Sequence, residues 1–286
     1  MKDRPRFSGG RSIPDGDTLS FLTKCLEQLT FKQYFNNIHN EYCDTFRSWI
    51  NSTTENSVEG LHLFSYQQFT QGTTEAIDKF YMRHKDRTVK VLRGEYAYHF
   101  LGGYGEPLDE PLSRGDALII SLPFGSSGGN HRYNELLAEA NKLQVPVFVD
   151  CTWFGVCRDM HFDFSYPCIE QIAFSLSKAF PLAYLRIGCR FTKPQVYDGL
   201  NAYESDGYLN WTAQSIGIKF MNQFSPDYIP KKYHKAQQAM CDELNLTPTN
   251  CVQIALGGSE WDHLKRHQWN RLCLSDEIIG WLWQQK

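Results

Sequence analysis

Hydrophobic residues gather in the central part of the chain into short continuous runs, each bounded by Gly, Pro or polar turn residues. Strands that are buried on both faces are continuously apolar, whereas strands exposed on one face alternate apolar and polar residues. Stretches with the three- and four-residue spacing of amphipathic helices separate these runs. The chain is therefore predicted to be an α/β protein, with a mostly parallel sheet covered by helices on both faces. The runs that read as strands are 89–94, 116–125, 145–155 and 169–180.

The two ends of the chain have a different pattern. Residues 1–17 are polar and rich in Gly and Pro, and helical periodicity follows to about Ile50, with Asp17 or Thr18 as the capping residue. Beyond residue 195 the sequence predicts helices, then short strand-like pieces and a final helix. The predicted division is an N-terminal arm with helices that form part of a small domain (1–58), a large domain with the sheet (59–195), and C-terminal helices with the rest of the small domain (196–286).

The 286-residue chain has an ordinary globular composition, with 42% hydrophobic residues, 21% charged residues and a net charge of −3. Such a chain has no electrostatic attraction for nucleic acids or anionic membranes, so neither is expected as a partner. The nine cysteines are odd in number and include no CxxC pair, and no apolar run approaches the ~20 residues of a membrane span. Without a signal-peptide pattern, the chain is expected to be cytoplasmic, with free thiols and no metal site.

Polar side chains follow two of the predicted strands at the points where the strands end. VPVFVD places Asp150 at the end of one strand, and AFSLSK places Ser175, Ser177 and Lys178 directly after another. Ligands of parallel sheets bind beyond the carboxyl ends of the strands. These side chains are therefore expected to belong to one site.

An anion site is expected beside them. Residues 72–74, GTT, precede an amphipathic helix, and the free N–H groups and dipole of a helix N-terminus favour an anion. Arg186 can add a bidentate contact to a phosphate. Lys178, in apolar and cationic surroundings, would have a depressed pKa and act as a nucleophilic amine. A phosphate cup, a carboxylate and such a lysine suit pyridoxal phosphate, which needs a Schiff-base lysine and a partner for its ring nitrogen.

The segment SLSKAFPLAYLRIGCRF resembles the Schiff-base motif of the fold-type I pyridoxal-phosphate enzymes, in the class I/II aminotransferase superfamily. In that motif S-x-x-K is followed, eight residues after the lysine, by an arginine. The resemblance implies that Lys178 is the Schiff-base lysine, and that Ser175 and Arg186 hold the phosphate. Ser177, beside the lysine, is assigned to the same cofactor site.

Two further segments resemble parts of the same cofactor site. GTTEAI resembles the phosphate-cup turn of the family, which implies backbone contacts from Gly72 and Thr73 and a further contact from Thr74. VPVFVD resembles the strand that ends in the aspartate beside the pyridinium nitrogen. That resemblance makes Asp150 a second catalytic residue, next to Lys178.

GEYAYH resembles the aromatic element that stacks on the cofactor ring, with Tyr96 favoured over Tyr98. RLCLS resembles the segment whose arginine binds the substrate α-carboxylate, which implies this role for Arg271. Each segment alone also has a purely structural interpretation. Asp150 could cap a turn, GTTEAI could be no more than the start of a helix, and Arg271 could be a surface residue on an edge strand.

Two positions depart from the family pattern. LPFGSSG stands where the family has N-P-x-N-P-T-G, so Gly125 replaces an asparagine that contacts the phenolic oxygen of the cofactor. Trp153 replaces a tyrosine near the same oxygen and is assigned to the cofactor site, although its indole N–H cannot ionise. Ser126 or Ser127 could substitute for the missing partners. Two reaction classes stay open: amino transfer, and the lyase, decarboxylase, cyclase or oxidase chemistry of specialised amino-acid metabolism.

The resemblance also implies the architecture. It predicts an aspartate aminotransferase-like, seven-stranded sheet, a cofactor-binding role for residues 59–195, and a small α+β domain at the C-terminus. It further implies an amino-acid or amine substrate and a homodimer with the site at the subunit interface. Tyr34 and Tyr42 are the two candidates for a tyrosine that reaches the phosphate of the partner chain.

Overall fold

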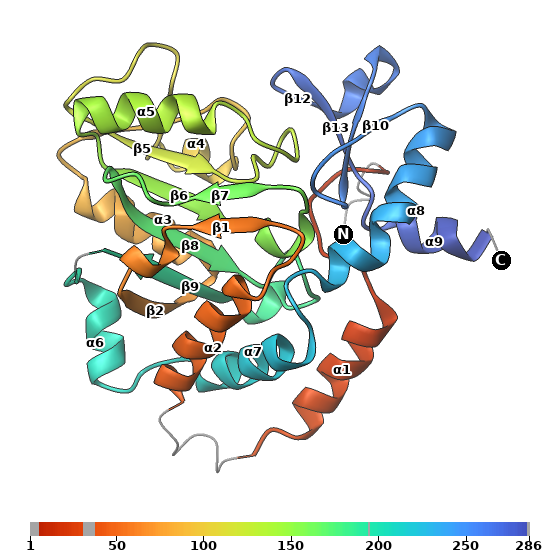
Figure 1. The fold of residues 1–286 in the computed structure, drawn as a ribbon, viewed down its shortest axis with the longest axis horizontal. Coiled ribbons are helices and arrows are strands. Elements are labelled where there is room, and N and C mark those ends of the chain that lie inside the picture. Colours follow the sequence, from red (N-terminus) through yellow and green to blue (C-terminus); the bar gives the residue numbers. More distant parts are fainter. Residues whose placement is uncertain (1–5, 31–37, 194, 285–286) are drawn as a thin grey trace.

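The computed structural model describes residues 6–30, 38–193 and 195–284, and a seven-stranded sheet forms its centre (Figure 1). The strand order is β2-β9-β8-β6-β5-β3-β4. All neighbours from β8 to β4 are parallel, whereas β9 runs antiparallel to both β2 and β8. The prediction of a mostly parallel, seven-stranded sheet is confirmed. The strands are β2 (Tyr66–Gln71), β3 (Thr88–Val91), β4 (Glu106–Pro107), β5 (Asp116–Ser121), β6 (Val147–Cys151), β8 (Ile169–Ser175) and β9 (Ile187–Thr192).

The described α-helices are α1 (Gly16–Glu27), α2 (His39–Asn51), α3 (Gly72–Arg83), α4 (Tyr98–Leu101), α5 (Tyr133–Leu143), α6 (Gly199–Ser205), α7 (Trp211–Gln223), α8 (Tyr228–Leu244) and α9 (Glu277–Gln284). These helices lie on both faces of the sheet. Successive residues of a strand point to opposite sides, so each central strand packs against helices on both faces. Ala117 and Ile119 pack with α3 on one face. Leu118 and Ile120 belong to the larger core on the other face, together with apolar residues of α2 and α5.

The N-terminal helical stretch contains the helices α1 and α2. The prediction that Asp17 or Thr18 caps the first helix is wrong, because the helix begins at Gly16 and Asp15 is its N-cap. Oδ1 of Asp15 accepts a hydrogen bond from the backbone N of Thr18 at 2.9 Å. The hydroxyl of Tyr233 in α8 donates to the same buried carboxylate at 2.7 Å. The contact with α8 thus favours Asp15, and not Asp17 or Thr18, as the N-cap of α1.

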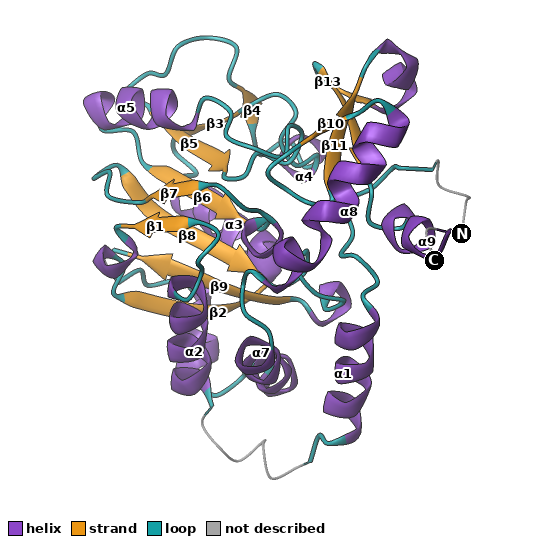
Figure 2. Cartoon of the chain, turned by 45° about the vertical axis from the view of Figure 1, so that its right-hand side comes forward, coloured by secondary structure: helices purple, strands orange, loops and turns teal. Residues whose placement is uncertain are grey.

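The C-terminal part contains a small antiparallel sheet in the order β10-β11-β13-β12. Figure 2 shows this sheet and α8 beside the large sheet. A small α+β part at the C-terminus is as predicted, while α7 packs against α2 and β9 of the large sheet. The three domain boundaries stay a prediction. The remaining strands are β1 (Ser57–Glu59), β7 (His161–Asp163), β10 (Thr247–Pro248), β11 (Ile254–Gly257), β12 (Lys265–Arg266) and β13 (Trp269–Cys273).

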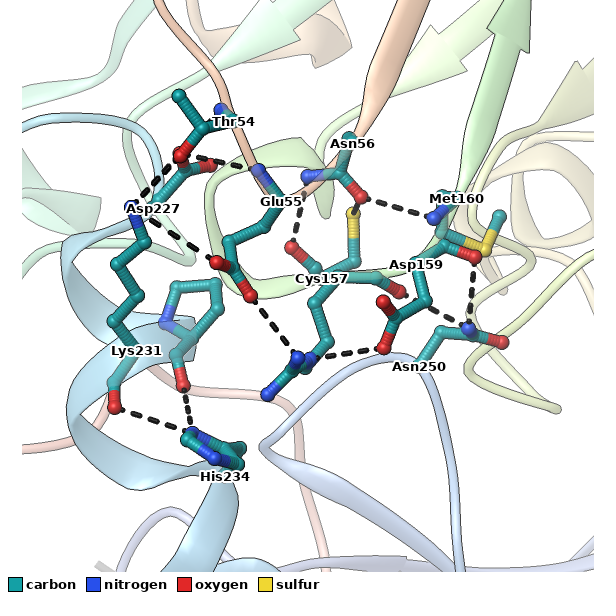
Figure 3. A network of polar contacts seen from close by, with 12 residues as sticks. Thr54, Glu55, Asn56, Cys157, Asp159, Met160, Asp227, Lys231, His234 and Asn250 are labelled. Carbon is teal, nitrogen blue, oxygen red and sulfur yellow. Dashed lines mark hydrogen bonds and ion pairs between the residues drawn. The ribbon is translucent and has the colours of Figure 1, made fainter.

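A polar network joins α8 to loops at the flank of the large sheet (Figure 3). Asp227, the N-cap of α8, accepts from the backbone N of Thr54 at 2.6 Å and lies 3.7 Å from Nζ of Lys231. Asn250, before β11, donates to the carbonyl of Asp159 at 3.4 Å. These contacts fix where the small sheet stands relative to the large one.

No helix in the described ranges is both long enough and apolar enough to cross a membrane. All nine cysteines are free and buried. Within the part of the chain that the structure covers, no three His, Cys, Asp or Glu side chains form a cluster suited to a metal ion.

Candidate active site

The carboxyl ends of β6 and β8 bring two of the predicted groups of polar residues to one edge of the sheet. The two strands are parallel neighbours, and Asp150 pairs in register with Ala173. Asp150, Ser175 and Ser177 are buried, and Lys178 is half-buried. Residues predicted at two separate strand ends therefore lie together.

The Asp150 carboxylate is held by Thr152, which the sequence motifs did not single out. Oδ1 of Asp150 accepts from the backbone N of Thr152 at 2.9 Å and from its hydroxyl at 2.6 Å. The hydroxyl of Thr73, at the start of α3, lies 2.7 Å from the Thr152 hydroxyl. Burial raises the pKa of Asp150, and the bonds from Thr152 and the charge of Lys178 oppose that rise. The Asp-x-Thr spacing, typical of a local Asx turn, was the available sequence signal.

The amine of Lys178 has a strongly depressed pKa. Burial is the main cause, and the positive charges of Arg271 and Arg186 add to it, whereas Asp150 acts in the opposite direction. Together these effects lower the pKa of Lys178 to about 8. Roughly a tenth of the amine is therefore neutral and nucleophilic at about pH 7, far more than for an ordinary lysine.

Three contacts position Lys178. Its Nζ donates to the carbonyl of Gly10 in the N-terminal arm. The same nitrogen lies 5.1 Å from the ring centroid of Trp153. Gln253, just before β11, donates from Nε2 to the backbone carbonyl of Lys178 at 2.7 Å. The small sheet thus supports the loop that carries the lysine.

A close contact joins the N-terminus of α3 to Arg186. Gly72 has a φ of +71°, and a Cβ on it would lie 2.6 Å from Nη2 of Arg186. The same nitrogen donates to the hydroxyl of Thr74 at 3.1 Å. Gly188, in β9, also packs closely, since a Cβ there would lie 2.9 Å from Cα of Gly72. Only glycine fits at position 72, where a guanidinium and a helix N-terminus meet as an anion site would require.

The two serines before Lys178 bond to each other. The hydroxyl of Ser175 lies 2.8 Å from that of Ser177 and 3.1 Å from the carbonyl of Ile187. Because Ile187 immediately follows Arg186, this contact fixes the backbone next to the arginine. The hydroxyl proton of Ser175 is engaged by protein acceptors, which leaves Ser177 as the better donor to a ligand.

Arg271 lies in the middle of the small sheet and is buried, so it is not a surface residue on an edge strand. Burial, reinforced by the charge of Arg266, lowers its pKa to about 10. Nη1 donates to the carbonyl of Gly9 at 2.5 Å, and Nε and Nη2 have no hydrogen-bond partner among the described residues. The guanidinium carbon lies 5.4 Å from the ring centroid of Trp153.

The N-terminal arm therefore runs over both cations. The carbonyls of Gly9 and Gly10 accept from Arg271 and Lys178. The arm is anchored along β13 and the residues after it, because the backbone N of Cys273 donates to Phe7 and the hydroxyl of Ser275 to Arg11, at 2.7 and 2.6 Å. No local motif indicated these backbone contacts.

Tyr96 and Tyr98 stack on each other, with centroids 5.7 Å apart and an interplanar angle of 15°. The hydroxyl of Tyr98 donates to Asp78 of α3 at 2.6 Å, which ties that ring to the helix. Tyr96 is 55% exposed, so its ring is the less constrained of the two. The role of Tyr96 in stacking stays a prediction.

Glu95 was not singled out by the motifs, yet its carboxylate is buried at the same edge of the sheet. Its two oxygens accept from the backbone N and the hydroxyl of Ser121, at 2.8 and 2.6 Å. Ser121 pairs in register with Asp150. Burial raises the pKa of Glu95 to about 7, and the negative charge of Asp150 contributes.

The structure separates the remaining candidates. Tyr34 lies outside the described residues. The suggestion that Tyr42 reaches a partner chain is wrong, because Tyr42 is fully buried and its hydroxyl donates to the carbonyl of Gly188 at 2.8 Å. The hydroxyl of Ser126 donates to the carbonyl of Gly94. The hydroxyl of Ser127 is buried without a partner in the described part of the chain.

No protein-family model and no curated protein sequence matches the chain. The structure, however, is similar to many solved structures. An aminotransferase from Staphylococcus aureus superposes with a TM-score of 0.64 at 12% identity, covering 96% of this chain and 90% of that one. Histidinol-phosphate aminotransferase from Clostridium acetobutylicum gives 0.60 at 15% identity, covering 97% and 96%.

A PLP-bound C-S lyase from Staphylococcus hominis, in complex with the inhibitor L-cycloserine, gives a TM-score of 0.68 at 13% identity, covering 100% of this chain and 88% of that one. The similarity extends over nearly the whole length of each of these proteins. At such identities it establishes a shared architecture. The chain therefore has the aspartate aminotransferase-like fold that its sequence predicts.

Proposed function

We propose that the chain is a pyridoxal-phosphate-dependent enzyme acting on an amino acid or amine, an aminotransferase with Lys178 as Schiff-base lysine and general base. One observation carries the proposal: the amine of Lys178 lies among Arg271, Arg186 and Asp150 and has a pKa of about 8. Such an amine is a nucleophile near neutral pH, which an ordinary lysine is not. The fold shared with aminotransferases and C-S lyases supports the same assignment.

The described residues fit the separate groups of pyridoxal phosphate. The phosphate suits the N-terminus of α3, where Gly72 lets the Arg186 guanidinium contact the backbone. The ring nitrogen suits Asp150, whose ionised form keeps a proton on that nitrogen. Two N–H groups of Arg271 lack protein partners in the described ranges, so they suit a substrate carboxylate.

Bound pyridoxal phosphate would supply an electron sink for the charge that develops at the substrate α-carbon. Arg271 orients the substrate through its carboxylate. Lys178, once its amine is free, removes the α-proton as a general base and returns a proton. Asp150 holds the proton on the ring nitrogen, and Thr152 keeps its carboxylate in place.

A lyase, decarboxylase, cyclase or oxidase is the second candidate. The observation in its favour is the pair Gly125 and Trp153, which stand where the family has an asparagine and a tyrosine. Groups at these positions set the charge of the cofactor, so their exchange bears on the reaction class. The fold, shared with a C-S lyase as well as with aminotransferases, accommodates either chemistry.

Replacing Lys178 by alanine tests the assignment. The chain loaded with pyridoxal phosphate is expected to show the visible absorbance of a Schiff base, and Lys178→Ala is expected to abolish it. Lys142→Ala, on the exposed side of α5, is the matched control and should keep the band. A band that survives in Lys178→Ala contradicts the assignment.

A panel of amino acids separates the two reaction classes. An aminotransferase turns over only when a keto acid is present to accept the amino group, and a donor alone converts the cofactor to its amine form. Release of ammonia or carbon dioxide without a keto acid would instead favour the second candidate. Absorbance spectra and mass spectrometry of the products measure both outcomes.

We also infer a homodimer in the reducing cytosol. Nine free, buried thiols suit a reducing compartment. Tyr184 is 96% exposed in the single chain although it lies two residues before Arg186. The homodimer itself is what the resemblance to fold-type I enzymes implies, and Tyr184 is a position near the proposed phosphate site at which it can be tested.

A further inference from the structure

We propose that the indole N–H of Trp153 is the hydrogen-bond donor to the phenolic oxygen of bound pyridoxal phosphate, and that Gly125 is the residue that makes room for it. This inference rests on the proposed function. It concerns the two positions at which the chain departs from the family and deepens the account of the same site.

The phenolic oxygen has to lie close to the lysine. In pyridoxal phosphate it is carried by the ring carbon adjacent to the one that bears the aldehyde. When the aldehyde carbon is joined to Lys178, the oxygen is therefore within a few bonds of Nζ. Any protein group that binds this oxygen must come from the immediate surroundings of the lysine amine.

Trp153 meets this condition. It follows β6, three residues after Asp150, and its ring centroid lies 5.1 Å from Nζ of Lys178. Trp153 as a residue is 9% exposed, and its ring is also contacted by Arg271, whose guanidinium carbon lies 5.4 Å from the centroid. Two cations near one indole hold the ring at the reacting amine.

The N–H of this indole is available. None of the described residues accepts a hydrogen bond from Nε1 of Trp153, and this nitrogen is not among the fully buried unpaired atoms, so a ligand can reach it. A ligand oxygen beside Lys178 would supply an acceptor in place of solvent. The indole is a donor only and cannot ionise, so the donor of this bond would stay neutral at every working pH.

Gly125 is the counterpart of the indole. A Cβ on Gly125 would lie 3.2 Å from Nε1 of Trp153 and 3.8 Å from its Cε2. Gly125 is not among the glycines with positive φ, so its backbone would accept any residue. A side chain at position 125 would therefore not strain the backbone. It would instead take the space next to the edge of the indole that carries the N–H.

The neighbouring serines fit the role less well. The hydroxyl of Ser126 is used on the carbonyl of Gly94. The hydroxyl of Ser127 is unpartnered, but its backbone belongs to the turn that closes onto Phe124, and no contact with Lys178 or Trp153 supports it. Ser127 is therefore the competing donor that an experiment has to separate from Trp153.

The bond has a spectroscopic consequence. A donor to the phenolic oxygen draws negative charge away from it and so weakens the attraction of that oxygen for the proton on the imine nitrogen. Removing the donor is expected to make this proton harder to lose. Loss of one hydrogen bond to a charged oxygen corresponds to a rise in the Schiff-base pKa of roughly one unit.

An absorbance titration of three loaded proteins tests the inference: the wild type, Trp153→Phe and Ser127→Ala. Trp153→Phe keeps an aromatic ring beside Lys178 but removes the N–H, so its Schiff-base pKa should rise by roughly one unit. Ser127→Ala should titrate like the wild type. An unchanged titration in Trp153→Phe, or a shift in Ser127→Ala alone, overturns the inference and leaves the proposed function standing. A wild type that forms no Schiff base overturns both.

A double-mutant cycle in the cofactor-free chain tests the geometry separately. Gly125→Ala should lower the melting temperature when Trp153 is present, because its Cβ meets the indole nitrogen. In the Trp153→Phe background the smaller ring lacks that atom, so the same substitution should cost much less. Equal losses in the two backgrounds would show that the glycine does not make room for the indole, and would overturn that part of the inference.

Discussion

Glu95 is a single residue whose protonation should make the stability of the fold depend on pH below neutrality. Its carboxylate is buried between two donors of Ser121, and burial raises its pKa in the folded chain to about 7. An unfolded glutamate titrates near ~4.3. The folded chain therefore retains a proton that the unfolded chain loses. The contribution of Glu95 to the free energy of unfolding is therefore fully present below the unfolded pKa. It is lost as the pH rises through about 7.

Glu95→Gln is expected to remove this dependence, because the amide can keep both bonds to Ser121 without titrating. Relative to the variant, the wild type should lose on the order of 2 kcal/mol of unfolding free energy between about pH 5 and about pH 8. Urea denaturation of the cofactor-free chain measures it. Glu110→Gln, at an exposed position, is the control and should follow the wild type. If Glu95→Gln also follows the wild type, Glu95 carries no shifted proton.

Residues of the proposed site could be predicted from sequence where the signal is local. Lys178, Asp150 and Gly72 each stand at the end of a strand or the start of a helix, so the chain pattern alone gives their place. Gly10 and Gln253 could not be found this way, since both reach Lys178 across more than seventy positions of sequence.

At the scale of elements, the N-terminus of α3 is the feature on which cofactor binding should depend most. Gly72→Ala places a methyl group 2.6 Å from the Arg186 guanidinium and at a φ of +71°, which alanine rarely adopts. Strain of this kind is worth about 1–3 kcal/mol. We expect pyridoxal phosphate to bind about tenfold or more weakly, as measured by absorbance titration.

Gly16→Ala is the matched control for this change. Gly16 is also the first residue of a helix, but a Cβ there meets nothing within 4 Å. Its affinity for pyridoxal phosphate should therefore equal that of the wild type. If Gly72→Ala binds as tightly as Gly16→Ala, the start of α3 is not the phosphate site.

The elements themselves were predictable to different degrees. Continuous apolar runs gave the central strands, because only strands covered on both faces have this composition. The direction of β9 was not predicted, although the chain contains the reason. Only residues 176–186 lie between β8 and β9, too few for the helical crossover that a parallel partner requires. The burial of Tyr42 could not be predicted in this way. The spacing of apolar residues does not distinguish a tyrosine in the core from one that faces a partner chain.

For the whole molecule, the proposed homodimer predicts a particle of two chains. Sedimentation velocity of the loaded protein should give twice the mass of one chain at micromolar concentrations. Tyr184→Glu would place a charge on the region that the second chain is inferred to cover, and should shift the distribution toward single chains. A single-chain mass for the wild type at every concentration tested would contradict the proposal.

The N-terminal arm has a consequence for any measurement of ligand affinity. Gly9 and Gly10 give their carbonyls to Arg271 and Lys178, the two groups assigned here to the substrate carboxylate and the cofactor. The arm is thus an intramolecular competitor whose effective concentration does not change on dilution. The Lys178 amine can react with the cofactor only in the fraction of chains in which the Gly10 carbonyl has let go, so the apparent dissociation constant of the cofactor exceeds the intrinsic one by the reciprocal of that fraction.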